Sequence, residues 1–440
     1  RDAANFGVWS LSRRYTSDEL LSVDTNVIRL TPSTSNQTTV IQAMAVQLLL
    51  SACLDPAGNI RRGSSAALQE LIGRHPNQVV EGISVVQIVD YQAVGLRKRG
   101  LIDVAGKAAS LDYTYWEALV DGLIAWRGLR SVDVPSREAA AYSLARLAAI
   151  REGEDGRAFV AGRLLDSLEG SSSSDVETMH GLVCSLSNLL DLPTDAVASE
   201  AQNALHRRFW LSVQSRGVSR IDFTPRSLKS ELPVAMAKLV TGVCRIEASY
   251  LAKHEGTQDS VFFEDMGNFV QRLLARHEDP ILLVVPDMVK QLGNLQKALS
   301  QPPDCIAVET LSRAVAADGS KAVLAGAGRA IALGTVALRH ADELHSDVAA
   351  LAVSSLANLV TARNVDWRII GLRALHLVLA GIDDSVKSEL QIIATVVQAT
   401  HAGLTDYTID ERGDIGSLVR LQGLICVSSL LSLGMLAEDT

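Results

Sequence analysis

The sequence has few aromatic residues, few cysteines and no long uncharged apolar run. Phe, Trp and Tyr make up 4% of its 440 residues, which is too few for a surface that stacks nucleic-acid bases. The five cysteines lie far apart without a C-x-x-C pair, so we expect buried thiols in a reducing compartment. No apolar run reaches the ~18 residues that a membrane-spanning helix needs. The sequence therefore predicts no membrane span.

Motifs that carry catalysis are also missing. The chain has no H-E-x-x-H metal helix, no phosphate-binding loop and no G-x-S-x-G nucleophile turn. Gly326-Ala327-Gly328 begins like a dinucleotide-binding loop, but Ile331 occupies the place of the third glycine. No strand is expected before it, so a close helix crossing is the better interpretation. We predict that the chain is not an enzyme and holds no metal or other cofactor.

The composition is that of a globular, mildly acidic protein. Hydrophobic residues make up 48% and charged residues 21% of the chain, which excludes a largely disordered protein. The 41 basic and 50 acidic residues give a net charge of -9. Nucleic acids and anionic membranes attract basic surfaces, so the charge argues against a nucleic-acid partner.

Apolar residues recur with the period of an α-helix. Between Asp55 and Gly73 one such stripe is formed by Ile60, Ala67, Leu68, Leu71 and Ile72. Arg61 and Arg62 are expected on its solvent face, and Gly73 is expected to end the helix in a left-handed conformation. We expect Trp9, Trp116, Trp126 and Trp210 to fill gaps between such helices. A short helix with one apolar stripe needs a neighbouring helix to cover it.

The spacing of helix starts indicates a repeat. Asp347, Asp366 and Ser385 follow one another at intervals of 19 residues (366 − 347 and 385 − 366). Two helices in ~38 residues are close to the HEAT-type repeat. We therefore predict an all-α, HEAT/armadillo-type α-solenoid of stacked antiparallel helix pairs with no sheet, forming a single domain over 1–440. An irregular stretch is expected at about 206–233 and an inserted loop at about 404–413. Because the chain does not begin with Met, we expect it to be a fragment of a longer protein.

Five stretches resemble the tubulin-binding cofactor D family, which are HEAT-repeat tubulin chaperones. In chain order they are Arg1-Asp2-Ala3-Ala4, Asn59-Ile60-Arg61-Arg62, Asp90-Tyr91-Gln92-Ala93-Val94-Gly95-Leu96-Arg97, Met179-His180-Gly181 and the run from Asp406-Tyr407-Thr408 to Arg420. They follow the order of the family and extend almost from end to end. The third and the fifth are the most specific, because they are loop and cap sequences rather than generic helix faces.

The resemblance implies a function in tubulin folding. The family binds β-tubulin and acts with an Arf-like small GTPase and tubulin cofactors E and C to assemble or dissociate the αβ-tubulin heterodimer. With cofactor C it stimulates GTP hydrolysis by tubulin, an activator role that needs no catalytic site in this chain. A cytoplasmic, cytoskeleton-associated location is implied as well. The alternatives are an importin-like transport receptor, although no repeated W-x-x-x-N is present, and a scaffold HEAT protein.

Eight residues are candidates for partner binding, in three places: Tyr91 and Arg97 in one turn, Arg216, Arg220 and Arg226 in a basic segment, and Tyr407, Asp410 and Arg412 in the inserted loop. For the turn, the alternative is a structural lock between neighbouring repeats. The basic segment runs from Arg207 to Lys229 with six basic residues and one acidic residue, and its alternative is a solvated connection. For the inserted loop, the alternative is a solvated loop followed by helix capping at Asp414.

Overall fold

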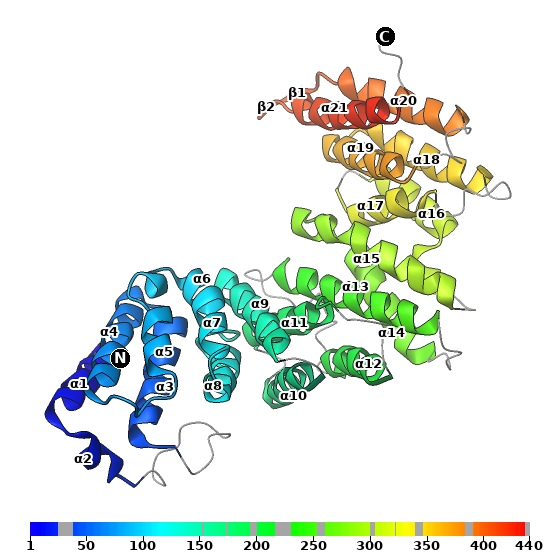
Figure 1. The fold of residues 1–440 in the computed structure, drawn as a ribbon. Helices are drawn as coiled ribbons and strands as arrows, with labels where there is room; N and C mark the ends of the chain where they lie inside the picture. Colours follow the sequence, from blue (N-terminus) through cyan, green and yellow to red (C-terminus); the bar gives the residue numbers. More distant parts are fainter. Residues whose placement is uncertain are drawn as a thin grey trace. The chain divides into compact units, whose positions relative to one another are not determined.

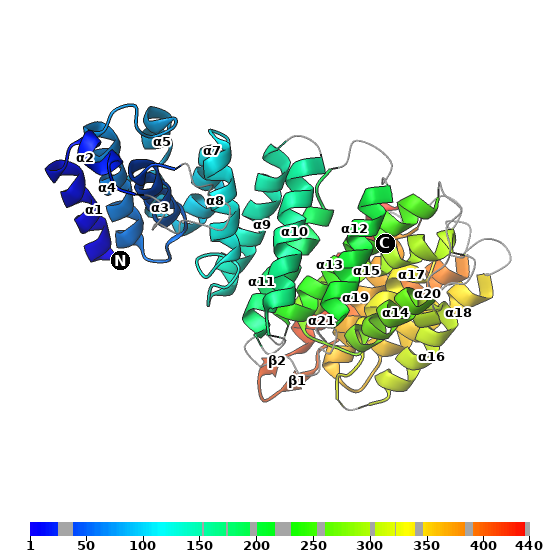
Figure 2. The same cartoon turned by 90° about the horizontal axis from the view of Figure 1, so that it is seen from below.

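The computed structural model describes residues 1–24, 38–151, 154–172, 175–193, 200–215, 230–252, 260–299, 304–321, 323–338, 346–382 and 390–435. Almost every secondary-structure element in these ranges is a helix (Figures 1 and 2). The chain divides into two compact units, of which unit 1 is built mainly from Arg1–Thr194 and unit 2 mainly from Lys229–Thr440. The predicted all-α solenoid is confirmed. That the chain forms one domain over 1–440 stays a prediction.

Unit 1 stacks helices from α1 to α11. They are α1 (Asp2–Arg14), α2 (Ser17–Leu21), α3 (Val40–Leu54), α4 (Gly58–Arg74), α5 (Gly82–Ile88), α6 (Arg97–Arg99), α7 (Ala105–Ala109), α8 (Tyr113–Ile124), α9 (Val134–Ile150), α10 (Glu154–Gly170) and α11 (Val176–Leu190). A 3₁₀ turn, Ala93–Gly95, precedes α6, and a π-helical turn, Gly100–Val104, joins α6 to α7. Helix α4 packs between α1 and α3, and α9 packs against α10 and α11.

Unit 2 is arranged in two layers. Its helices are α13 (Glu231–Leu251), α14 (Ser260–Leu274), α15 (Asp279–Ala298), α16 (Val308–Gly319), α17 (Ala327–Val336), α18 (Ser346–Val360), α19 (Val365–Ala380), α20 (Leu390–Leu404) and α21 (Gly416–Ser432). Helices α16, α18 and α20 pack on one another in one layer, and α17, α19 and α21 do so in the other. Figure 1 shows this stack in yellow to red. Such nearest-neighbour packing defines a solenoid.

Short polar side chains start many of these helices. The side chains of Asp112, Asp133, Asp175 and Asn364 accept hydrogen bonds from backbone N–H groups in the first turns of α8, α9, α11 and α19. These bonds satisfy N–H groups that have no partner within the helix. The sequence thereby fixes where each helix begins.

Four of the five residues of the predicted stripe in α4 are buried and Ile72 is half-buried, but two details of that helix differ from expectation. Arg61 is only 3% exposed, because it bonds backbone oxygens instead of facing solvent. Gly73 lies inside the helix, which ends at Arg74, and His75 after it has a φ of -122°. Trp116 and Trp210 are buried as expected, whereas Trp126 is half exposed beside two arginines.

The two segments predicted to be irregular, 206–233 and 404–413, contain parts of regular elements. Residues 206–215 belong to α12 (Glu200–Ser215), and α13 begins at Glu231 with Pro233 in its first turn, where its missing N–H costs nothing. Leu404 is the last residue of α20, and a short antiparallel hairpin, β1 (Ile409–Asp410) and β2 (Gly413–Asp414), follows it. These two-residue strands are the only strands in the described ranges. Among the described helices, none is long and apolar enough to cross a membrane.

Candidate partner-binding surfaces

One arginine contact recurs at the start of three helices. Arg61, Arg137 and Arg368 are each the fourth residue of their helices, α4, α9 and α19. Each guanidinium donates to the backbone oxygens of the residues six and five positions earlier, which form the preceding turn: Asp55 and Pro56, Ser131 and Val132, and Ala362 and Arg363. The three arginines therefore hold the turn within each helix pair.

The same arginines also reach the next helix pair. Arg61 donates to the Val94 and Gly95 oxygens, both at 2.7 Å. Burial and the nearby charge of Arg97 lower the pKa of Arg61. Arg137 Nε donates to His180 Nδ1 at 3.2 Å. Each of these contacts ties one repeat to the next.

In unit 2, Arg368 donates to Asp406 Oδ2 at 2.7 Å and to Thr408 Oγ1 at 2.8 Å. The segments that receive the three arginines, around 94–95, 180 and 406–408, coincide with three of the stretches that resemble the tubulin chaperones. Gly181, beside His180, allows close packing, because a Cβ there would overlap the backbone oxygen of Leu129. A structural requirement of the solenoid therefore accounts for part of each motif.

Tyr91 and Arg97 lie together on a surface of unit 1 that we call the turn surface. It consists of Arg1, the α3–α4 turn with the start of α4 (55–62), residues 90–99 and the α8–α9 turn (126–133). Arg97 donates to Asp133 Oδ1 at 2.9 Å, to Ser131 Oγ at 3.0 Å and to the Arg127 oxygen at 3.3 Å. Arg97 thus makes the contacts of a lock between repeats.

Other side chains of the turn surface are open to solvent. Tyr91 is half exposed, and the guanidinium of Arg62 lies 5.3 Å from the centre of its ring. Leu96 is 70% exposed and Val132 is 82% exposed. Tyr91 is thus accessible to a partner.

Trp126 is the aromatic centre of the turn surface. The guanidinium groups of Arg1 and Arg127 lie 5.2 Å and 4.9 Å from its ring centre. Arg1 also pairs with the buried carboxylate of Asp55 at 2.8 Å, and Arg127 lies 3.9 Å from the same carboxylate. One buried negative charge therefore holds two arginines against a half-exposed indole ring.

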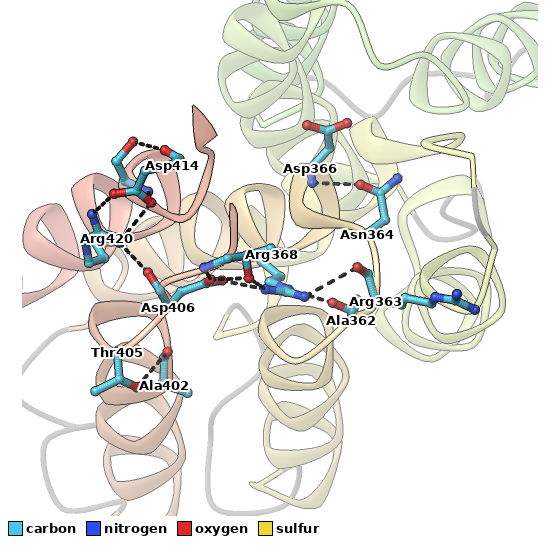
Figure 3. A network of polar contacts seen from close by, with 12 residues as sticks. Ala362, Arg363, Asn364, Asp366, Arg368, Ala402, Thr405, Asp406, Asp414 and Arg420 are labelled. Carbon is cyan, nitrogen blue, oxygen red and sulfur yellow. Dashed lines mark hydrogen bonds and ion pairs between the residues drawn. The ribbon is translucent and has the colours of Figure 1, made fainter. Parts of the chain in front are cut away.

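The hairpin of unit 2 is anchored by two ion pairs (Figure 3). Arg368 binds Asp406, and Arg420 binds Asp414 at 2.6 Å while also donating to the backbone oxygen of Asp406. Burial opposes ionisation of Asp406, but hydrogen bonds from Thr408 and Arg368 outweigh it and lower the pKa. Arg420 likewise lowers the pKa of Asp414. Both carboxylates are thus held charged at the base of the hairpin.

The outer part of the hairpin is exposed and partly apolar. Tyr407 is 72% exposed and Ile409 is 74% exposed. Arg412 pairs with Asp410 at 2.8 Å, and this bond lowers the pKa of the Asp410 carboxyl. The three aspartates of the hairpin each have an arginine of their own. The sequence interpretation considered only Arg412 and missed Arg368 and Arg420.

The hairpin ends at Asp414, two residues before α21 begins. Asp414 Oδ1 accepts from the backbone N–H of Ser417 at 3.1 Å, so this residue does bond the first turn of the helix as predicted. Leucines at 418, 421, 424 and 431 of α21 are exposed. The hairpin and this helix face together present apolar side chains to solvent.

The basic segment is described only at its start. Arg216, Arg220 and Arg226 lie outside the described residues. Arg207 lies in α12 and binds the buried carboxylate of Glu247, which His206 also contacts at 2.6 Å. Burial opposes ionisation of Glu247, but these two partners lower its pKa. At least one of the six positive charges of the segment is therefore neutralised within the fold.

The fold and these surfaces define a class, the α-solenoid built of helical repeats. No family model matches the chain. Over 190 residues the chain is 24% identical to "Tubulin-specific chaperone D" of Dictyostelium discoideum, an alignment that covers 43% of this chain and 11% of that protein. Among solved structures, a crystal structure of an engineered protein aligns with 97% of this chain and 95% of its own, with 16% identity and a TM-score of 0.34. A TM-score this low carries no argument.

The described residues contain no group of three or more His, Cys, Asp or Glu side chains placed to hold a metal ion. Of the candidate residues, Asp410 and Arg412 bind each other. Tyr91 lies against Arg62, Arg97 binds the 127–133 turn, and Tyr407 lies against Arg420. The sequence signal that was missed is the arginine at the fourth helical position. Each of these arginines follows the first residue of the preceding turn by six positions, which can be read from the sequence. Whether the arginine is buried depends on which backbone oxygens the fold places near its guanidinium group.

Proposed function

We propose that this chain is part of a tubulin folding cofactor that binds β-tubulin. The observation that carries the proposal is the 24% identity over 190 residues to a tubulin-specific chaperone, found in a chain with an α-solenoid fold. A solenoid offers an extended surface to a large protein partner.

The finer parts of the proposal follow from the family. The chain acts with an Arf-like small GTPase and tubulin cofactors E and C in assembling or dissociating the αβ-tubulin heterodimer, in the cytoplasm and at the cytoskeleton. It contributes to GTP hydrolysis by tubulin as an activator, without a catalytic site of its own.

The hairpin is the contact that we assign to β-tubulin in unit 2. Tyr407 and Ile409 are presented on a short turn whose base is fixed by two arginines, so little conformational freedom is lost when a partner binds. Aromatic and arginine side chains in such positions carry much of the energy of protein interfaces.

Binding to purified β-tubulin, measured by surface plasmon resonance, tests the proposal. The double substitution Tyr407→Ser with Ile409→Ser should weaken binding about tenfold or more, because burying each side chain contributes about 1–2 kcal/mol. Leu351→Ser is the matched control, since Leu351 is exposed on α18 of the same unit. If wild type does not bind β-tubulin, the proposed function is wrong; if both variants bind like wild type, only the assignment of the hairpin is wrong.

The same assay separates the two rival functions. An importin-like receptor would bind a nuclear-import cargo, and a scaffold HEAT protein would bind a phosphatase subunit. Binding to either of these together with no binding to β-tubulin would favour that rival.

A further inference from the structure

The turn surface of unit 1 differs in charge from the rest of the chain. Its segments, Arg1, 55–62, 90–99 and 126–133, contain eight basic and three acidic residues, a net charge of +5 in a chain whose net charge is -9. One of the three carboxylates, Asp55, is buried, and a second, Asp133, is bound by Arg97. Arg61 is buried as well, and Arg1 and Arg97 are the ion-pair partners of these two carboxylates. The positive charge that a partner meets therefore comes mainly from four exposed side chains, Arg62, Lys98, Arg99 and Arg130.

Apolar side chains lie among these basic groups. Leu96 and Val132 project into solvent next to Arg97 and its partner Asp133. The half-exposed ring of Trp126 lies against the guanidinium groups of Arg1 and Arg127. Contacts hold these side chains in place: Arg61 fixes the 94–95 turn, and Arg97 fixes the 127–133 turn. The turn surface is thus preorganised, basic and partly apolar.

We propose that the turn surface binds an acidic polypeptide segment that carries interspersed aromatic or aliphatic side chains. Carboxylates of the segment would pair with exposed arginines such as Arg62 and Arg130, and its apolar side chains would cover Leu96 and Val132. Fields of this kind act over about 8 Å at physiological salt, so they orient the segment and accelerate its binding. The inference stands on the charges and contacts of unit 1 and does not depend on binding to β-tubulin.

A nucleic acid fits this surface less well. Its phosphates would satisfy the arginines, but its polar backbone would leave Leu96 and Val132 uncovered. An acidic polypeptide can match both the positive charge and the apolar side chains.

Fluorescence anisotropy with the full chain tests the inference. The probe is a labelled peptide of Glu-Glu pairs separated by single Leu or Phe residues, and the comparison probes are the same peptide with Gln for Glu and oligodeoxythymidine of equal length. The Glu peptide should bind at least tenfold more tightly than either comparison probe, and its affinity should fall as salt is added.

Paired charge reversals locate the site. Arg62→Glu with Arg130→Glu should weaken binding of the Glu peptide about tenfold or more, because both side chains are exposed on the turn surface. The matched control is Arg74→Glu with Arg146→Glu, which reverses two exposed arginines of α4 and α9. Arg74 lies twelve residues beyond Arg62, about 18 Å along the helix. The control pair should change the affinity less than twofold.

Leu96→Ser with Val132→Ser tests the apolar contribution. This pair should weaken the Glu peptide about threefold or more and leave the thermal unfolding midpoint unchanged, because both side chains are already in water. The inference is overturned if the Glu peptide does not bind, if the control reversals weaken it equally, or if oligodeoxythymidine binds more tightly. The last outcome would identify a phosphate-binding surface instead.

Discussion

Replacing Arg61 by Met tests whether the recurrent arginines hold the solenoid together. Met has a similar length and no charge, so the substitution removes the hydrogen bonds and leaves the space filled. Arg61 donates to the oxygens of Asp55, Pro56, Val94 and Gly95 at 2.7–2.9 Å. These bonds connect the turn before α4 to the segment that precedes α6.

The loss in the free energy of unfolding depends on whether each of the four oxygens finds another hydrogen-bond donor. The bonds to Asp55 and Val94 are buried, and those to Pro56 and Gly95 are partly buried. A buried oxygen that loses its donor costs about 1–3 kcal/mol, whereas the two partly buried oxygens can bond water. Burying the apolar Met side chain returns about 1–2 kcal/mol. The expected loss in the free energy of unfolding of unit 1 is about 3 kcal/mol.

Thermal unfolding and hydrogen exchange measure this effect. For a unit of this size a loss of about 3 kcal/mol lowers the unfolding midpoint by about 6–12 °C. Amide exchange in 55–57 and 90–99 should accelerate more than exchange in α9 to α11, because the lost bonds connect those two segments.

Arg62→Met is the matched control. Arg62 is adjacent in sequence but exposed, and its contact in the structure is with the ring of Tyr91. Its loss should cost under about 1 kcal/mol. A midpoint for Arg61→Met that lies within error of the control would refute the reasoning, because the buried bonds would then contribute nothing measurable.

Three further predictions concern ionic groups. Arg368→Met should cost about 2–4 kcal/mol and accelerate amide exchange in 406–416, because the hairpin loses its anchor at Asp406; unchanged exchange would contradict this. Glu247→Gln should cost about 3–5 kcal/mol in urea unfolding, since it leaves the arginine of a buried pair without its carboxylate; a cost below about 1 kcal/mol would show that water replaces the carboxylate. Burial opposes ionisation of Glu278, but bonds from Arg276 and the backbone lower its pKa to about 2 from an ordinary value of 4.5. A depressed pKa stabilises the fold above the ordinary value, and solvent screening reduces the contribution of this partly exposed pair, so about 1 kcal/mol should be lost as pH falls from about 4.5 to 2; a Glu278→Gln variant with the same pH dependence as wild type would exclude this.

The buried apolar stripes and the polar helix caps could be predicted from the sequence because they depend on nearby residues. Ile60, Leu68 and Leu71 are buried as their spacing indicates. Asn364 starts α19 through its own side chain. The expected interval of 19 residues separates the starts of α18 and α19, whereas α20 is described from Leu390 and Ser385 lies outside the described residues. Repetition of such helices was enough to predict an all-α solenoid, since each stripe needs a neighbour to cover it.

The tertiary structure decided which charged residues are partners. In the sequence, Arg61 and Arg62 are equivalent neighbours on a helix, yet one is buried on four backbone oxygens and the other faces solvent. Asp406 and Arg368 are separated by 38 residues and meet only because successive helix pairs stack. A guanidinium can be buried only where the fold supplies enough acceptors. Those acceptors come from turns of different repeats. The apolar spacing within one helix therefore predicts that the helix is packed against others, while the neighbouring repeats determine which of its arginines is buried.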